Sequence, residues 1–397
     1  MTQDHPLSQN VEHGGSALSG ILLVAGTCIG AGMLALPVVT AKAGFFPALG
    51  INLFCWLFML MTGLLYLEAT LWMDDGAHVL SIAKNLLGFV GETISGIAFG
   101  FLYYCLMVAY ITGGVHLLFS GISEISIFWG FAFIFAVIVA LGSRFIDRVN
   151  MILMGGLVIS YFLLITIGSS GIHWEYFQKR EWWLLVPAAP IFFSAYGYHN
   201  IIPSITSYLN RDKKKLRLSI LIGTAIPFVV YCMWQWLVIG SVEPETLALA
   251  QEQGKSASEV LQSAVHNPWV EKLGTFFGFF AIVTSLLGVS FSMVDFLGDG
   301  LNMKRVGFHR IFLCLLVFVP PTVVATFYPS IFLRALSVAG GIGEAFLNGL
   351  LPVAMVWMGR YRLRYEKDEM LPGGKTLLLL IAFISFVIMG IEIVSWF

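Results

Sequence analysis

Ionisable side chains are rare in the apolar stretches of this chain, and four of them stand where they could do chemistry. Each lies within or at the edge of a long hydrophobic segment: Glu68, His199, Asp295 and Glu344. A charged group at membrane depth is costly, so such residues usually face the protein interior or an aqueous path. They are candidates for carrying a proton or for forming a gate. The alternative is structural in each case: a hydrogen bond to freed backbone, a helix cap or an ion pair.

A glycine-rich break lies inside the first apolar stretch, where residues 26–37 read GTCIGAGMLALP. Each glycine costs about 1 kcal/mol relative to alanine in a helix interior. Open backbone at membrane depth persists only where protein buries it or where it lines a cavity. The break is therefore a candidate binding site, formed by Gly26, Thr27, Gly30, Ala31 and Gly32. The alternative is a G-x-x-x-G motif for helix packing.

A second break interrupts a later apolar stretch, residues 184–209. Pro187, Pro190 and Pro203 bracket this part of the chain, and each interior proline removes a backbone hydrogen bond and clashes with the preceding turn. We expect no straight helix here. The residues around this break are further candidates for substrate binding: Phe193, Ser194, Ala195, Tyr196, Tyr198, His199 and Asn200.

Composition places the chain among helical membrane proteins. It is 58% hydrophobic and 11% charged, with a mean hydropathy of +0.86, whereas an ordinary soluble domain is about 25% charged. The net charge of -1 argues against a nucleic-acid partner. The five cysteines lie in apolar runs, and no C-x-x-C or Cys/His cluster occurs. We therefore expect no disulfide, no metal site and no cofactor.

Apolar runs long enough to cross a bilayer predict eleven transmembrane helices. Their approximate limits are 17–41, 47–73, 90–121, 125–142, 148–170, 184–209, 215–241, 269–298, 308–328, 331–359 and 373–396. Most of the 22 Lys and Arg residues follow the even-numbered spans, which places the N-terminus in the cytoplasm and the C-terminus outside. We also expect a short surface helix within 242–268 and a brief interfacial helix at 77–87.

The two breaks occupy matching places in the first and sixth spans, which indicates an internal repeat. Because five spans separate the two starts, the second copy enters the membrane from the opposite side. We expect residues 1–16 to form a cytoplasmic tail. Residues 17–170 and 184–359 form two inverted repeats of five spans, and 373–397 add one extra span. This all-α membrane fold, with helices 1 and 6 discontinuous, places a substrate between the broken helices.

The exposed backbone of two broken helices suits an amino acid. Amide N–H groups at the N-terminus of a half-helix favour a carboxylate, and carbonyl groups freed at the opposing half-helix favour an ammonium group or a cation. An amino acid carries both charges a short distance apart. Backbone alone could therefore hold the part that all amino acids share, which leaves selectivity to side chains elsewhere in the spans.

Four segments resemble the hydroxy/aromatic amino acid permease family, which contains the bacterial tyrosine-specific and tryptophan permeases of the amino acid/polyamine/organocation superfamily. They are GTCIGAGMLALP at 26–37, FSAYGYHNIIPS at 193–204, TSLLGVSFSMVDFLGD at 284–299 and YPSIFLRAL at 328–336. The likeness runs from about residue 17 to the end. The chain departs from the family pattern at Cys28, and at Tyr196 and Tyr198, where phenylalanines are common. These departures leave the exact substrate open.

The resemblance implies a sodium-symporter-like core of five plus five helices and proton-driven uptake of tyrosine or tryptophan across the bacterial inner membrane. Thr284 and Ser285 resemble the hydroxyl pair that binds sodium in related transporters, although such hydroxyls also bond within helices. The aromatic residues near the second break could stack an aromatic substrate or pack the core. Tyr103, Tyr104 and Tyr110 of the third span are further pocket candidates.

The leading hypothesis is a secondary active transporter that imports an aromatic amino acid, tyrosine first, by proton symport and alternating access. The alternative is a tryptophan or broader aromatic permease, with sodium as an alternative coupling ion. A channel is more remote, because channels usually gather identical subunits around a pore. An enzyme ranks last, since no Ser-His pair or H-E-x-x-H motif occurs. Partners are thus the substrate, the coupling ion and the lipid bilayer.

Overall fold

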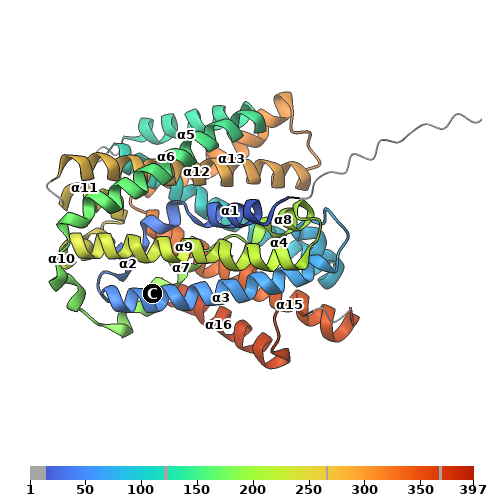
Figure 1. Cartoon of the computed structure of the whole chain (residues 1–397). Coiled ribbons are helices and arrows are strands. Elements are labelled where there is room, and N and C mark those ends of the chain that lie inside the picture. Colours follow the sequence, from blue (N-terminus) through green and yellow to red (C-terminus); the bar gives the residue numbers. More distant parts are fainter. Residues whose placement is uncertain (1–14, 120–123, 265–266, 366–368) are drawn as a thin grey trace, which may run out of the picture.

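The computed structural model describes residues 15–119, 124–264, 267–365 and 369–397, which fold almost entirely into helices and contain no strand. The long helices run side by side along one direction, with α3 and α16 on one flank and α5, α6 and α13 on the other (Figure 1). Their bounds are α3 Phe45–Leu71, α4 Val79–Leu118, α5 Ile125–Ala140, α6 Ser143–Gly168, α9 Lys213–Ser241, α12 Pro268–Gly300, α13 Gly307–Phe327 and α16 Gly374–Val394.

Eight helices of the described chain are long and apolar enough to cross a membrane, or nine candidates if one bent pair counts as a single span. The prediction of an all-helical membrane protein is confirmed. The fourth predicted span, 125–142, corresponds to the shorter apolar helix α5, and the sixth, 184–209, is divided into short pieces. The count of eleven spans therefore stays a prediction.

The first predicted break is present. Helix α1 (Ala17–Cys28) ends before the short 3-10 helix η1 (Ala31–Leu34) and helix α2 (Leu36–Thr40) begin. The two halves meet at an angle of 46°, and Pro37 stands in the first turn of α2, where its missing N–H is not needed. Glycine and proline therefore open this span as the sequence predicts.

The second predicted break is also present. After η4 (Trp182–Ala188), helix α7 (Ala189–Ala195) ends, and the chain resumes as η5 (His199–Ile201) and α8 (Ile202–Tyr208). The two breaks pack against each other at Gly32. A Cβ atom added there would lie 2.8 Å from the Cα of Ala195, so only glycine permits this approach.

A continuous helical stretch from the C-terminal part of the chain packs against the second break. It consists of α14 (Phe332–Val338), the π-helix η6 (Ala339–Leu350), α15 (Leu351–Trp357) and the π-helix η7 (Met358–Leu363). A Cβ atom added to Gly340 would lie 1.8 Å from the carbonyl oxygen of Pro190. Helices α7 and η6 therefore touch backbone to backbone, which brings Glu344 close to the second break.

Two predicted loop regions differ in detail from expectation. The predicted interfacial helix 77–87 and the span after it form the single helix α4, which is kinked where Gly88 adopts a φ of 73°. Segment 242–268 holds two helices, α10 (Pro244–Glu252) and α11 (Ala257–Ala264). Their residues Leu247 and Leu261 are buried, so this segment covers one end of the bundle rather than carrying one surface helix. The predicted tail falls largely on residues 1–14, which lie outside the described residues.

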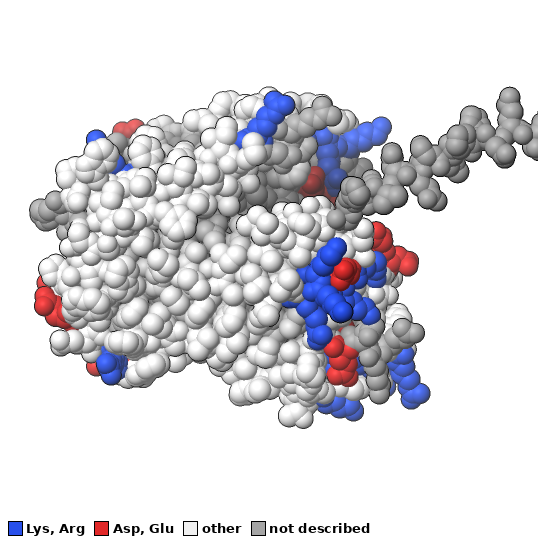
Figure 2. Space-filling view, in the orientation of Figure 1, with Lys and Arg blue, Asp and Glu red and all other residues white. Residues whose placement is uncertain are grey.

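Charge is distributed as a membrane protein requires. On the face seen in Figure 2, Lys, Arg, Asp and Glu gather at the two ends of the molecule and leave the sides between them almost uncharged. Most of the basic residues on this face lie at the right-hand end of the view, the end where Figure 1 labels α8. The uncharged sides match the apolar length of the helices.

Candidate functional site

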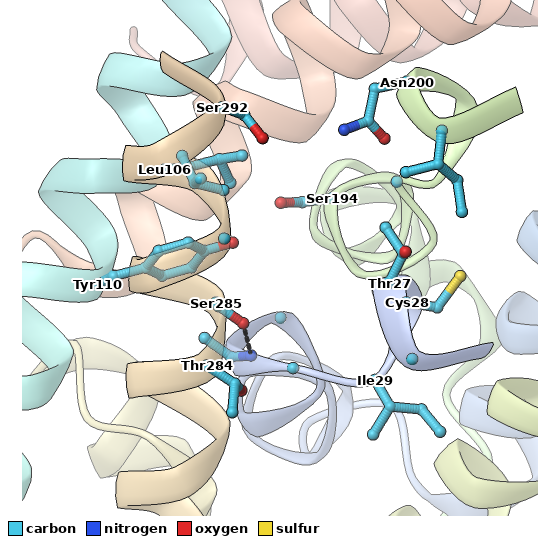
Figure 3. A pocket seen from close by; sticks show the side chains of 18 of the residues that line it. Thr27, Cys28, Ile29, Leu106, Tyr110, Ser194, Asn200, Thr284, Ser285 and Ser292 are labelled. Carbon is cyan, nitrogen blue, oxygen red and sulfur yellow. Dashed lines mark hydrogen bonds between the residues drawn. The ribbon is translucent and has the colours of Figure 1, made fainter. Parts of the chain in front are cut away.

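A cavity of about 440 Å³ lies at the two breaks and is lined by both of them together with α4, α6, α12 and η6 (Figure 3). Many of the residues that the sequence singles out line it: Gly26, Thr27, Gly30, Ala31, Gly32, Ser194, Asn200, Thr284, Ser285 and Glu344. Residues more than 300 positions apart in the chain thus share one site.

The first break offers mainly backbone to this cavity. The N–H of Ala31, at the start of η1, donates to Ser285 Oγ of α12 at 2.9 Å, as the dashed line in Figure 3 shows. Thr27 turns its hydroxyl to its own helix and donates to the carbonyl of Leu23 at 2.8 Å. The break is therefore tied to α12 through one amide, while small residues keep its remaining backbone close to the cavity.

Tyr231 of α9 joins the two breaks. Its hydroxyl lies 2.7 Å from the carbonyl oxygen of Cys28 and 2.8 Å from that of Ala195, the last residues of α1 and α7. The side chain is fully buried. Because a phenol has one proton to donate, the two carbonyl groups share it. Sequence reasoning missed this residue, since a single tyrosine in an apolar span carries no motif.

The second break turns two faces to different neighbours. Ser194, Gly197 and Asn200, spaced three apart, line the cavity. The hydroxyl of Ser194 has no hydrogen-bond partner within the described residues, so it is available to a ligand. This spacing puts the intervening aromatic residues on the other side of the segment.

The large side chains of this break pack against α3 instead of lining the cavity. Tyr196 donates to Asn52 Oδ1 at 2.7 Å, and Tyr198 donates to the carbonyl of Met59 at 3.1 Å. His199 Nε2 lies 2.9 Å from Thr62 Oγ1. Phe193 packs against Phe58, with ring centroids 4.8 Å apart, and Ala195 contacts Gly32. All five predicted site residues of this group are buried. Large aromatic rings are stabilised more by this packed interface than by contact with a polar cavity.

Glu344 of η6 is the one acidic residue that lines the cavity among those described. It is 4% exposed and accepts a hydrogen bond from the side-chain amide of Asn348. A Cβ atom added to Gly197 would lie 2.4 Å from Glu344 Oε1, so the carboxyl group touches the open backbone of the second break. It forms no ion pair with any described residue.

The other two acidic candidates lie outside the cavity lining and form ion pairs. Glu68, at the end of α3, holds the guanidinium group of Arg360 through two contacts of 2.6 Å and accepts the N–H of Met370 at 2.8 Å. Asp295 contacts Arg305 at 3.2 Å, and Arg305 also contacts Asp299. These contacts match the structural alternative for both residues.

The three tyrosines predicted for the pocket in the third span lie on different faces of α4. Tyr104 donates to the carbonyl of Leu316 in α13 at 2.9 Å and does not line the cavity. Tyr103 and Tyr110 do line it, because residues seven apart lie on the same face of a helix. The spacing could have identified this pair from sequence, but it could not show which face is turned inward.

The hydroxyl groups proposed for an ion site already have partners. Thr284 donates to the carbonyl of Phe280 at 2.8 Å, and Ser285 accepts the amide of Ala31. No group of three His, Cys, Asp or Glu side chains that could hold a metal ion occurs among the residues that the structure describes.

A polytopic helical chain whose central cavity lies at two interrupted spans has the architecture of an integral membrane transport protein. Comparison with known sequences gives the family. The model of the tryptophan/tyrosine permease family matches residues 13–391, so the chain belongs to this family of permeases, which are not enzymes.

Three curated relatives are transport proteins with names that fit this family. Tyrosine-specific transport system 1 of Haemophilus influenzae is 32% identical over 93% of this chain and 94% of its own length. The tryptophan-specific transport protein of Shigella flexneri is 30% identical over 92% of each chain. The low affinity tryptophan permease of Escherichia coli is 28% identical over 84% of this chain and 85% of its own.

Proposed function

We propose that the protein imports an aromatic amino acid, tyrosine first, by proton symport and alternating access. The single observation that carries this proposal is the cavity at the two breaks, which offers open backbone together with aromatic and apolar side chains. The names of the relatives, which include both tyrosine-specific and tryptophan-specific transport proteins, support the substrate class.

The charged groups of the substrate bind at the breaks. Its carboxylate lies at the amides of Gly30–Gly32, beside Ser285. Its ammonium group faces the C-terminal carbonyl end of α1 near Gly26 and Thr27, and the free hydroxyl of Ser194. Tyr231 supports this arrangement, because its shared hydrogen bonds hold the two half-helices in one relative position.

The fold proposed for this activity has eleven spans. The bent first span, the short helix α5 and the interrupted segment 182–208 would add to the eight long helices. Residues 17–170 and 184–359 form the two inverted repeats, and 373–397 the extra span. The basic end is cytoplasmic, which puts the N-terminus inside and the C-terminus in the periplasm of a bacterial cell. An odd number of spans agrees with the position of the C-terminus at the end opposite the start of α1 (Figure 1).

Glu344 is the proposed proton carrier. It lines the cavity, touches the second break and forms no ion pair within the described chain, so its proton can be exchanged with the cavity as the substrate binds and leaves. His199 is less suited to this role, because its ring is fully buried between α3 and the second break.

The decisive test is uptake into proteoliposomes that contain the purified protein. Labelled tyrosine and tryptophan are supplied with a proton gradient alone or with a sodium gradient alone. We expect saturable, concentrative tyrosine uptake driven by the proton gradient. Uptake driven only by sodium would replace the proposed coupling ion. Binding of leucine without binding of tyrosine or tryptophan would overturn the substrate class.

A further inference from the structure

Four hydroxyl side chains form two levels along the cavity wall. Tyr103 and Tyr110 belong to α4, and Ser292 and Ser285 belong to α12, with all four lining the cavity. Each pair is seven residues apart, which corresponds to two helical turns, about 10.5 Å along the axis. Tyr110 lies near Ser285 and Tyr103 lies near Ser292, so the two helices set matching polar positions at both levels.

The level of Tyr110 and Ser285 adjoins the first break. Ser285 holds the amide of Ala31, and the hydroxyl of Tyr110 points into the cavity beside it (Figure 3). Under the proposed function, this level lies where the amino and carboxyl groups of the substrate bind. It therefore serves the part of the molecule that all amino acids share.

The level of Tyr103 and Ser292 gathers a third polar group, which comes from the second break. Tyr103 also lies near Asn200, and the side chains of Asn200 and Ser292 project into the same part of the cavity (Figure 3). Asn200 is the one exposed residue of its short helix η5, whose neighbour His199 is buried. We name Tyr103, Asn200 and Ser292 the distal polar cluster.

The wall between the two levels is apolar and open. Leu106 of α4 and Val289 of α12 line it. Gly288 lies there as well, and a Cβ atom added to it would meet nothing within 4 Å. Helices α4 and α12 thus leave an apolar slot beside Gly288, between two polar levels. This slot fits a flat apolar group that carries a polar atom at its far edge.

We propose that the distal polar cluster recognises the phenol hydroxyl of the substrate and so selects tyrosine against phenylalanine. This assignment rests on the proposed function. A phenol hydroxyl donates one hydrogen bond and accepts others, and the cluster supplies hydroxyl and amide groups that do both. A site built to bond a substrate hydroxyl rejects the analogue without it, because the polar groups of the site are left unpaired. Phenylalanine would leave the distal polar cluster facing its bare ring edge.

The test compares uptake of labelled tyrosine and phenylalanine by purified, reconstituted protein. Ser292→Ala and Tyr103→Phe each remove one hydroxyl from the cluster, and Ser290→Ala is the matched control. Ser290 lies two residues from Ser292 on α12, but it is buried, bonded to the carbonyl of Leu287 and outside the cavity lining. We expect each cluster variant to raise the KM for tyrosine about three- to tenfold, the effect of losing one hydrogen bond, with the phenylalanine KM unchanged or lowered.

A second variant examines the slot itself. Gly288→Leu fills the space between the two levels without touching protein atoms at its Cβ, so folding should be retained. We expect uptake of tyrosine and phenylalanine to fall by the same factor, at least tenfold, with their ratio unchanged. This pattern differs from that of the cluster variants, which change the ratio.

Each outcome decides the assignment. A lower ratio of tyrosine to phenylalanine uptake in both cluster variants, with an unchanged ratio in Ser290→Ala, supports it. An unchanged ratio in both cluster variants, or a wild-type protein that does not prefer tyrosine to phenylalanine, overturns the assignment and leaves the proposed function standing. Absence of uptake of every aromatic amino acid by the wild-type protein overturns the proposed function and the assignment with it.

Discussion

The two breaks interrupt their spans in opposite ways. At the first break the chain passes through Ile29 and Gly30 in extended conformation, and small residues leave its backbone next to the cavity. At the second break three large residues, Tyr196, Tyr198 and His199, turn toward α3 and bond to it. Its residues Ser194, Gly197 and Asn200, spaced three apart, line the cavity together with Ile201.

This difference separates two tasks that any selective amino acid site must perform. Under the proposed function, the first break provides backbone groups that bind the part shared by every amino acid. The second is anchored to α3 by its large side chains, and this anchoring positions Ser194 and Asn200 at the cavity. Four substitutions test whether the two breaks divide the work in this way.

The largest effect is expected where the two breaks touch. Gly32→Ala places a Cβ atom 2.8 Å from the Cα of Ala195, and overpacking costs about 1–3 kcal/mol even where side chains can move aside. Since backbone cannot move aside as a side chain does, we expect tyrosine uptake to fall by about 100-fold. Gly155→Ala in α6 is the control, because its Cβ would meet nothing within 4 Å. Wild-type uptake by Gly32→Ala would contradict the close packing of the breaks.

The next effect concerns Glu344, which joins the second break to η6. Glu344→Gln keeps the shape and the contact with Asn348 but removes the exchangeable proton. We expect concentrative uptake driven by a proton gradient to disappear, while exchange of labelled for unlabelled tyrosine across the membrane continues. Both are measured on the same proteoliposomes. A variant that still accumulates tyrosine against its gradient would exclude Glu344 as the proton carrier.

A smaller effect is expected at the hydroxyl that both breaks share. Tyr231→Phe removes this hydroxyl and leaves two buried carbonyl groups without their donor, at a cost of about 1–3 kcal/mol. We expect tyrosine binding to weaken by about tenfold or more in equilibrium binding to purified protein. Tyr161→Phe is the matched control: it removes a 2.9 Å bond from Tyr161 of α6 to the carbonyl of Val230 in α9, which involves neither break. Equal weakening by both variants would mean that Tyr231 acts on stability alone.

The smallest effect on transport is expected on the outer face of the second break. Tyr196→Phe keeps the ring but leaves Asn52 Oδ1 without its 2.7 Å donor. We expect the free energy of unfolding to fall by about 1–3 kcal/mol and the KM for tyrosine to change by less than about twofold. Thermal unfolding and initial uptake rates measure the two quantities. A large change in the KM for tyrosine would indicate that Tyr196 contributes to substrate binding.

Much of the fold could be predicted from sequence because its signals are local. Glycine and proline in the first span, and three prolines around the second break, act on the backbone within a turn of where they stand, and both breaks occur where they were predicted. The apolar lengths of the long helices reflect the bilayer in the same direct way. The division of 242–268 into two helices that each bury a leucine was missed, since the packing surface that buries Leu247 and Leu261 belongs to other parts of the chain.

The candidate site was predicted only in part. The backbone residues of the first break, Ser194, Asn200 and Glu344 all line the cavity, because a small or polar residue in an apolar segment needs a special surrounding. The aromatic residues Phe193, Tyr196 and Tyr198 were also expected there, but an aromatic ring suits a packed core as well as a ligand. Whether an aromatic ring packs in the core or lines the cavity depends on which helix lies opposite it.

Sequence alone therefore determined the membrane class, the two breaks and the resemblance that the family comparison confirms, because composition, glycine and proline act without reference to distant residues. Only the tertiary structure decided that α3 takes the aromatic face of the second break, that Tyr231 holds both half-helices, and that Tyr103 and Ser292 stand opposite each other. These relations depend on the rotation of each helix about its axis. That rotation follows from packing between segments far apart in the chain.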